Sequence, residues 1–139
     1  MTSGNIIKLY NFGNEWSKTK NNPAALAQVQ YICDSLTEKE ILTSTIRGHP
    51  FLHEVCDQSN MFEFLQYLWA QPKFRPYWDS QKYLDRYELT VFQRLSLRLY
   101  KDTKETQWVQ ENMRVIPATQ EHSNNLWQTR ITLATPYKI

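Results

Sequence analysis

Residues 89–99 read LTVFQRLSLRL, and toward the end of this stretch apolar and polar side chains alternate. Its last five residues are leucines separated by one serine and one arginine, ending at Leu99. A period of two residues is typical of a β-strand with one buried face, because successive side chains of a strand point to opposite sides. We therefore predict a strand that begins at residue 89.

Two later stretches follow a similar pattern. Residues 108–117 and 126–136 are apolar at alternating positions, and polar connections separate them from each other and from the first predicted strand. Residues 6–10 are apolar and β-branched and offer an extra edge strand. Neighbouring strands joined by short loops most simply form a meander. We predict a three- or four-stranded antiparallel meander in a β half of about residues 88–136.

Helix signals dominate the sequence before the predicted strands. Asn22 followed by Pro23 is typical of a helix start, because Asn caps a helix N-terminus and Pro suits the first helical position. Thr37 and Glu40 have the spacing of a capping box, in which each side chain bonds the backbone N–H of the other residue. Two further apolar stripes predict helices within residues 49–70. The sequence thus predicts four short helices.

These elements give an α+β fold. The N-terminal short helices, in a helical half of about residues 22–70, are expected to pack on the C-terminal meander, because their apolar stripes need a surface to cover. The chain has 139 residues, the usual size of one domain. We find no internal repeat and no linker in it. We therefore predict a single domain over residues 1–139.

The glycine content excludes two large classes of enzyme. The chain has three glycines, and neither GxGxxG nor GxxxxGK[ST] occurs, so a Rossmann or P-loop nucleotide site is not expected. Gly48 follows the predicted helix that begins at Thr37. We expect it to form the C-terminal cap of that helix, since glycine readily adopts a left-handed conformation.

Composition also bears on the compartment. No stretch has the roughly 18 consecutive apolar residues that a membrane span requires, and the first ten residues lack the pattern of a signal peptide. Cys33 and Cys56 are the only cysteines, whereas secreted domains of this size often carry several disulfides. We expect a cytoplasmic protein with both thiols free and no membrane contact.

Three potential metal ligands, His49, His53 and Cys56, have the spacing that places side chains on one face of a continuous helix. However, Pro50 makes His49 a capping or loop residue, and a free cysteine on an apolar stripe usually packs as a small hydrophobic residue. We therefore predict no metal, no cofactor and no catalytic residue. A small enzyme or metal-binding protein with a His/Cys site around residues 49–56 is the alternative function.

The strongest functional signal is the polar face of the predicted sheet. If the alternating apolar residues face the core, four arginines and two aromatic residues, Phe92 and Tyr100, share the opposite face, and the loop before the sheet adds further basic and aromatic residues. Arginine binds carboxylates and phosphates, and aromatic rings offer stacking surfaces. The predicted partner-binding residues are Arg94, Arg98, Arg114, Arg130, Lys73, Arg75, Tyr77, Trp78 and Tyr100.

The charge distribution agrees with that location. Residues 1–69 carry five Lys or Arg and seven Asp or Glu, whereas residues 70–139 carry eleven and seven, a net charge of +4. An anionic partner would therefore meet the second half of the chain. Such a face suits an acidic protein, single-stranded RNA or DNA, or simply solvent.

Together these features favour a binding role over catalysis. The sequence predicts a non-catalytic binding module, a small subunit or adaptor of a larger protein or ribonucleoprotein assembly, that contacts its partner through the Arg/aromatic sheet face. A protein partner is expected first and a single-stranded nucleic acid second.

Overall fold

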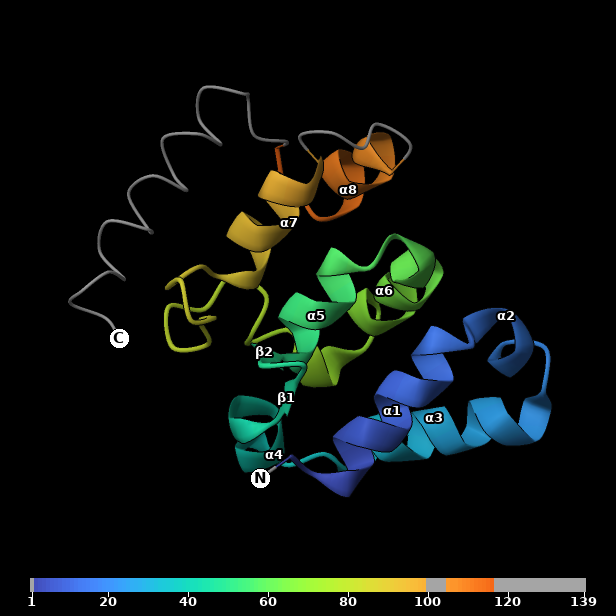
Figure 1. The fold of residues 1–139 in the computed structure, drawn as a ribbon. Helices are drawn as coiled ribbons and strands as arrows, with labels where there is room; N and C mark the ends of the chain where they lie inside the picture. The colour runs from blue at the N-terminus through green and yellow to red at the C-terminus, as the bar shows by residue number, and fades with distance from the viewer. Residues whose placement is uncertain (1, 100–104, 117–139) are drawn as a thin grey trace.

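The computed structural model describes residues 2–99 and 105–116 of the chain. In these residues the fold consists of short helices and one two-stranded hairpin (Figure 1). The α-helices are α1 (Gly4–Asn14), α2 (Trp16–Thr19), α3 (Pro23–Ser35), α4 (Glu38–Thr43), α5 (Phe51–Asp57), α6 (Phe62–Trp69), α7 (Val91–Leu99) and α8 (Thr106–Asn112). Strands β1 (Thr45–Ile46) and β2 (His49–Pro50) form the hairpin, and Ser59–Met61 (η1) and Pro72–Phe74 (η2) are 3₁₀ turns.

Two predicted helix starts are confirmed together with their caps. The Asn22 side chain accepts hydrogen bonds from the first amides of α3, and Pro23 occupies the first helical position. At α4, the Thr37 hydroxyl accepts from the Glu40 N–H while the Glu40 carboxylate accepts from the Thr37 N–H. Each cap satisfies backbone donors that have no partner inside the helix. Local side-chain chemistry therefore sets where these helices begin.

The predicted cap at Gly48 is wrong, because α4 ends at Thr43 and the chain forms a hairpin instead. Strand β1 pairs antiparallel with β2 across a two-residue turn. The turn residues Arg47 and Gly48 have φ angles of 55° and 83°. Two positive φ angles are the requirement of a type I′ turn, the turn that matches the twist of a tight hairpin. Gly48 therefore forms part of the hairpin turn and does not cap a helix.

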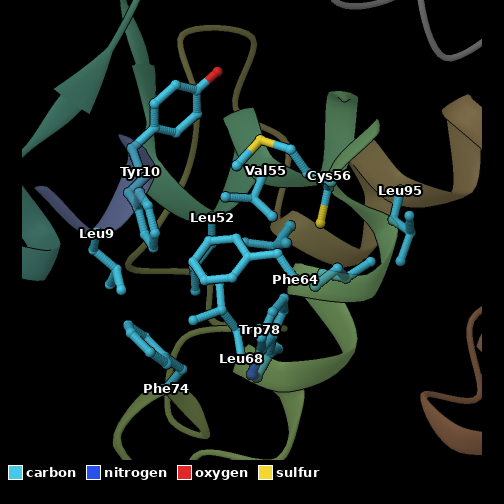
Figure 2. Close-up of a cluster of buried hydrophobic side chains, with 14 of the residues drawn as sticks. Leu9, Tyr10, Leu52, Val55, Cys56, Phe64, Leu68, Phe74, Trp78 and Leu95 are labelled. Atoms are coloured by element: carbon cyan, nitrogen blue, oxygen red, sulfur yellow. The ribbon is translucent and has the colours of Figure 1, made fainter. Parts of the chain in front are cut away.

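Helix α5 lies in the middle of the molecule, with α6, α7 and α1 around it (Figure 1). All its side chains from Phe51 to Cys56 are buried. Figure 2 shows Leu52 and Val55 of α5 in one cluster with Leu9 of α1, Phe64 of α6 and Leu95 of α7. A helix that is covered on every side is a core element. The core is thus built around α5.

The prediction of an α+β fold with a three- or four-stranded meander is wrong. Helix α1 replaces the predicted edge strand at residues 6–10, α7 replaces the first predicted strand, and α8 occupies part of the second. The third predicted strand, residues 126–136, lies outside the described residues. Within the described ranges, the only sheet is the hairpin.

Residues 91–99 are helical because their sequence also fits a helical period. Val91, Leu95 and Leu99 are four residues apart and all are buried, so they form one apolar stripe. The helix begins with a capping box that the alternation obscured. The Thr90 N–H donates to the Gln93 side chain at 2.9 Å, and the Gln93 N–H donates to the Thr90 hydroxyl at 3.1 Å. The cap and the stripe together specify a helix.

One hydrophobic cluster contains buried side chains from Ile6 in α1 to Val115 beyond α8. The helices and the loops between them therefore share a core over the described residues. In this part of the chain, each helix is too short or too polar to cross a membrane. The assignment of residues 1–139 to a single domain stays a prediction.

Candidate functional site

Arg94 is held inside the fold by two carboxylates. Its Nε donates to both oxygens of Asp57, at 3.0 and 3.1 Å, and its Nη2 donates to Asp57 Oδ2 at 2.7 Å. Its Nη1 donates to Asp85 Oδ2 at 3.3 Å. The side chain of Arg94 is 12% exposed and that of Asp85 is fully buried. Arg94 therefore connects the end of α5 to the loop before α7.

The other predicted arginines do not gather with Arg94 on one sheet face, since that sheet is absent from the described residues. Arg98 forms an ion pair with Glu105, and both side chains are nearly buried. Arg114 is exposed after α8 and has a φ angle of 59°. Arg130 and Tyr100 lie outside the described residues. A partner-binding role for these residues stays a prediction.

The residues predicted from the loop before α7 separate into two groups. Lys73 and Tyr77 pack against the fold, where the Lys73 ammonium donates to the Leu36 carbonyl at 2.9 Å and the Tyr77 ring contacts Tyr83. Burial raises the pKa of Tyr77, and the charge of Glu38 adds to this. Arg75 and Trp78, in contrast, line a common pocket.

This aromatic pocket lies where the end of α6, the following loop and the start of α7 meet. It has a volume of about 540 Å³ and is open to solvent. Trp69 is at its centre, with its ring centroid 5.4 Å from that of Trp78 and 6.1 Å from that of Phe92. The Phe92 N–H donates to the Trp78 carbonyl at 3.1 Å and fixes the loop to α7. The pocket is lined by Trp69, Ala70, Arg75, Trp78, Asp79 and Phe92.

Two opposite charges stand at the mouth of the aromatic pocket. Arg75 and Asp79 are both exposed, and neither side chain has a hydrogen bond or ion pair to another residue in the described ranges. Trp78 also lines the pocket and is only 2% exposed. Its indole N–H is buried and has no acceptor there either. The pocket thus combines ring surfaces with two charged groups that are available to a ligand.

The sequence predicted two of these pocket residues and missed the others. Trp69 looked like part of the apolar stripe of α6, and Phe92 was placed on the face of a strand. Asp79 has no distinctive neighbours. The available signal was the run of prolines and aromatic residues between Pro72 and Tyr83, which the structure confirms as an irregular loop with buried Phe74, Trp78 and Tyr83.

The thiol of the alternative site around residues 49–56 is not accessible to solvent. Cys56 is fully buried, and burial raises the pKa of its thiol. Burial likewise raises the pKa of Cys33 to about 12, so both thiols stay protonated near neutral pH. In the described part of the chain, no three His, Cys, Asp or Glu side chains lie close enough together to hold a metal ion. These contacts suit packing better than catalysis.

Glu54 is a buried carboxylate for which the sequence contains no evident signal. It is 2% exposed, and its Oε2 accepts from the Tyr10 hydroxyl at 3.3 Å and from Gln58 Nε2 at 3.1 Å. Burial raises the pKa of Tyr10, and the nearby charge of Glu54 raises it further. Both donors hold the carboxylate in place between α1 and α5, so Glu54 has a structural role.

We expect His53 to make the stability of the fold depend on pH. Its Nε2–H donates to the Leu89 carbonyl at 2.9 Å, and its Nδ1 has no partner among the described residues. Burial lowers the pKa of His53 below 6.5, although the hydrogen bond to Leu89 and the charge of Asp85 oppose this shift. The unfolded chain therefore binds a proton more readily than the folded chain below about pH 6.5. Stability from this residue is complete above that pH and is lost as the pH falls.

We expect His53→Gln to reduce this dependence, because the glutamine amide keeps a donor for Leu89 and does not titrate. Urea unfolding at pH 7.5 and pH 5.5 measures the effect. The unchanged protein should lose more unfolding free energy between the two values than the variant. Equal losses would show that His53 is not responsible.

Comparisons with protein-family models, with curated proteins and with solved structures found no match to this chain.

Proposed function

We propose that this chain is a non-catalytic binding module, a small subunit or adaptor of a larger assembly, that contacts a protein partner through the aromatic pocket. The observation that carries the proposal is the combination of half-buried Trp69 and Phe92 with exposed Arg75 around an open hollow of about 540 Å³. Trp and Arg contribute most often to binding energy at protein interfaces, where they surround or fill such pockets.

A protein partner is favoured over a nucleic acid because three of the predicted basic residues are bound to other groups of the fold in the described part of the chain. Binding of single strands requires cations that follow the phosphate backbone. Arg94 and Arg98 are committed to internal carboxylates, and Lys73 donates to a backbone carbonyl. Asp79 at the mouth of the pocket would also repel a phosphate. Arg75 alone provides little affinity for a strand.

The chemistry of the two thiols supports a cytoplasmic location for this module. Cys33 and Cys56 are both buried and free. Reduced thiols persist in the cytosol, whereas oxidising compartments favour disulfides. The buried, protonated thiols also give no support to a cysteine enzyme, which needs an accessible thiolate.

Replacing pocket residues should weaken the association with the native partner. We expect Trp69→Leu and Arg75→Gln each to weaken binding by about thirtyfold, which corresponds to about 2 kcal/mol for an interface hot spot. Affinity purification from the native cell, with quantitative mass spectrometry, compares each variant with the unchanged protein. Thermal unfolding checks that the variants are folded.

Arg86→Gln is the matched control, because Arg86 is an exposed arginine that does not line the pocket. It should retain every partner. Partners that both pocket variants retain at full yield would refute the proposal. An association that nuclease treatment removes would also refute the proposal. A nucleic acid, and not the pocket, would then make the contact.

A further inference from the structure

The walls of the aromatic pocket suit a positively charged group. Trp69 contacts Trp78 at an interplanar angle of 67° and Phe92 at 42°, and all three residues line the pocket. The face of an aromatic ring carries partial negative charge and attracts cations, and the attraction is strongest for Trp. Arg86 and Arg94 lie over the Tyr87 ring, but neither lines this pocket.

The two charged side chains at the mouth of the pocket favour ligand groups of opposite charge. Asp79 adds a carboxylate beside the rings and therefore favours a cation in the pocket. Arg75, four residues earlier in the loop, offers a planar guanidinium that binds a carboxylate through two hydrogen bonds. Neither charge is paired within the described ranges, so a ligand that carries a cation next to an anion would be complementary to both.

The scarcity of acceptors restricts the kind of cation. An unmodified lysine ammonium has three N–H donors and is strongly hydrated, so burying it requires several acceptors. Among the six lining residues, Asp79 is the only side chain that accepts hydrogen bonds from such a group. A trimethylammonium has no N–H to satisfy and presents methyl groups to the rings, as in other aromatic recognition sites for quaternary ammonium.

We infer that the group which enters the aromatic pocket is a trimethylated lysine side chain of the partner protein, followed in the partner by an acidic residue that binds Arg75. This inference rests on the proposed function and specifies the chemistry of the contact. The trimethylammonium lies against Trp69 and Phe92 with Asp79 beside it.

Fluorescence anisotropy with three short labelled peptides tests the inference on the full chain. The peptides share a glutamate after the variable position, which is trimethyllysine, lysine or a neutral analogue with a tert-butyl group in place of the trimethylammonium. We expect the trimethyllysine peptide to bind about tenfold more tightly than either of the others, as a cation–π contribution of this size implies.

Variants assign the binding to the pocket. Trp69→Leu keeps an apolar side chain but removes the ring, and Asp79→Asn removes the carboxylate charge, so each should weaken binding of the trimethyllysine peptide about tenfold. Arg75→Gln should weaken it only when glutamate follows the trimethyllysine, and not when glutamine does. Tyr31→Leu removes an exposed ring outside this pocket and should change nothing.

Two results would overturn the inference. Equal affinity for the neutral peptide would show that the pocket selects apolar shape and not charge. Absence of any binding by the trimethyllysine peptide would reject the ligand itself. In both cases the proposed function stands if Trp69→Leu still loses the native partner, and it fails separately if that variant retains the partner.

Discussion

Replacing Arg94 with methionine is expected to lower the free energy of unfolding by about 3–5 kcal/mol, because it leaves two carboxylates without their cation. Asp85 should account for most of this loss, because its side chain is fully buried. The side chain of Asp57 is 24% exposed and is partly hydrated. Without Arg94, Asp85 would keep the backbone N–H groups of Tyr87 and Leu89, which donate to its Oδ1. Urea unfolding at pH 7 measures the loss.

A second variant separates the unpaired charge from the lost packing. Asp85→Asn keeps an oxygen for the two backbone donors and removes the charge. Added to Arg94→Met, it should restore about 1–2 kcal/mol of the loss, since the two residues are in direct contact and their effects are not additive. A double variant that is less stable than Arg94→Met would contradict this explanation.

Gly13→Ala is expected to destabilise the fold by about 3 kcal/mol, although alanine is the better helix former by roughly 1 kcal/mol. A Cβ atom at Gly13 would lie 2.2 Å from two ring carbons of Phe64. The Phe64 ring is fully buried between Trp16 and Phe51, with centroid distances of 5.2 and 6.5 Å, and has no space to move. Steric overlap in the core therefore outweighs helix propensity.

Gly4→Ala is the matched control, because Gly4 lies in the same helix and a Cβ there would meet no atom within 4 Å. It should leave stability within about 0.5 kcal/mol. Combining Gly13→Ala with Phe64→Leu should give a coupling energy above about 1 kcal/mol, since the smaller side chain removes the overlap. If Gly13→Ala is as stable as the unchanged protein, the close approach of α1 and α6 is not as described.

Helices that begin with a local cap were predictable from the sequence. Asn22 with Pro23, and Thr37 with Glu40, act through groups within four residues of one another, so the pattern and the structure coincide. The Thr90 and Gln93 cap has the same spacing. It was overlooked because the alternating leucines after it also fit a strand. Where a sequence fits both a helical and a strand period, a capping box at its start indicates the helix.

The positions of the arginines were not predictable from the residues next to them in sequence. Arg94 binds Asp57, which is 37 residues away in sequence, and nothing near either residue indicates the pair. The alternating pattern therefore predicts that Arg94 lies on the surface, although its side chain lies inside the fold. The pocket shows a similar limit. Arg75 and Trp78 were expected at the site, but Trp69 and Phe92 reach it only through the packing of α6 and α7.

The central position of α5 has a consequence for how the protein is made. Seven residues are too few for a stable isolated helix, so α5 depends on its neighbours, of which α7 makes the most extensive contact. Arg94 of α7 follows Asp57 of α5 by 37 residues, a stretch that a ribosome adds in about 2–7 seconds. During that interval the apolar side chains of α5 lack their main cover. We therefore expect the nascent chain to expose the apolar side chains of α5 until α7 emerges.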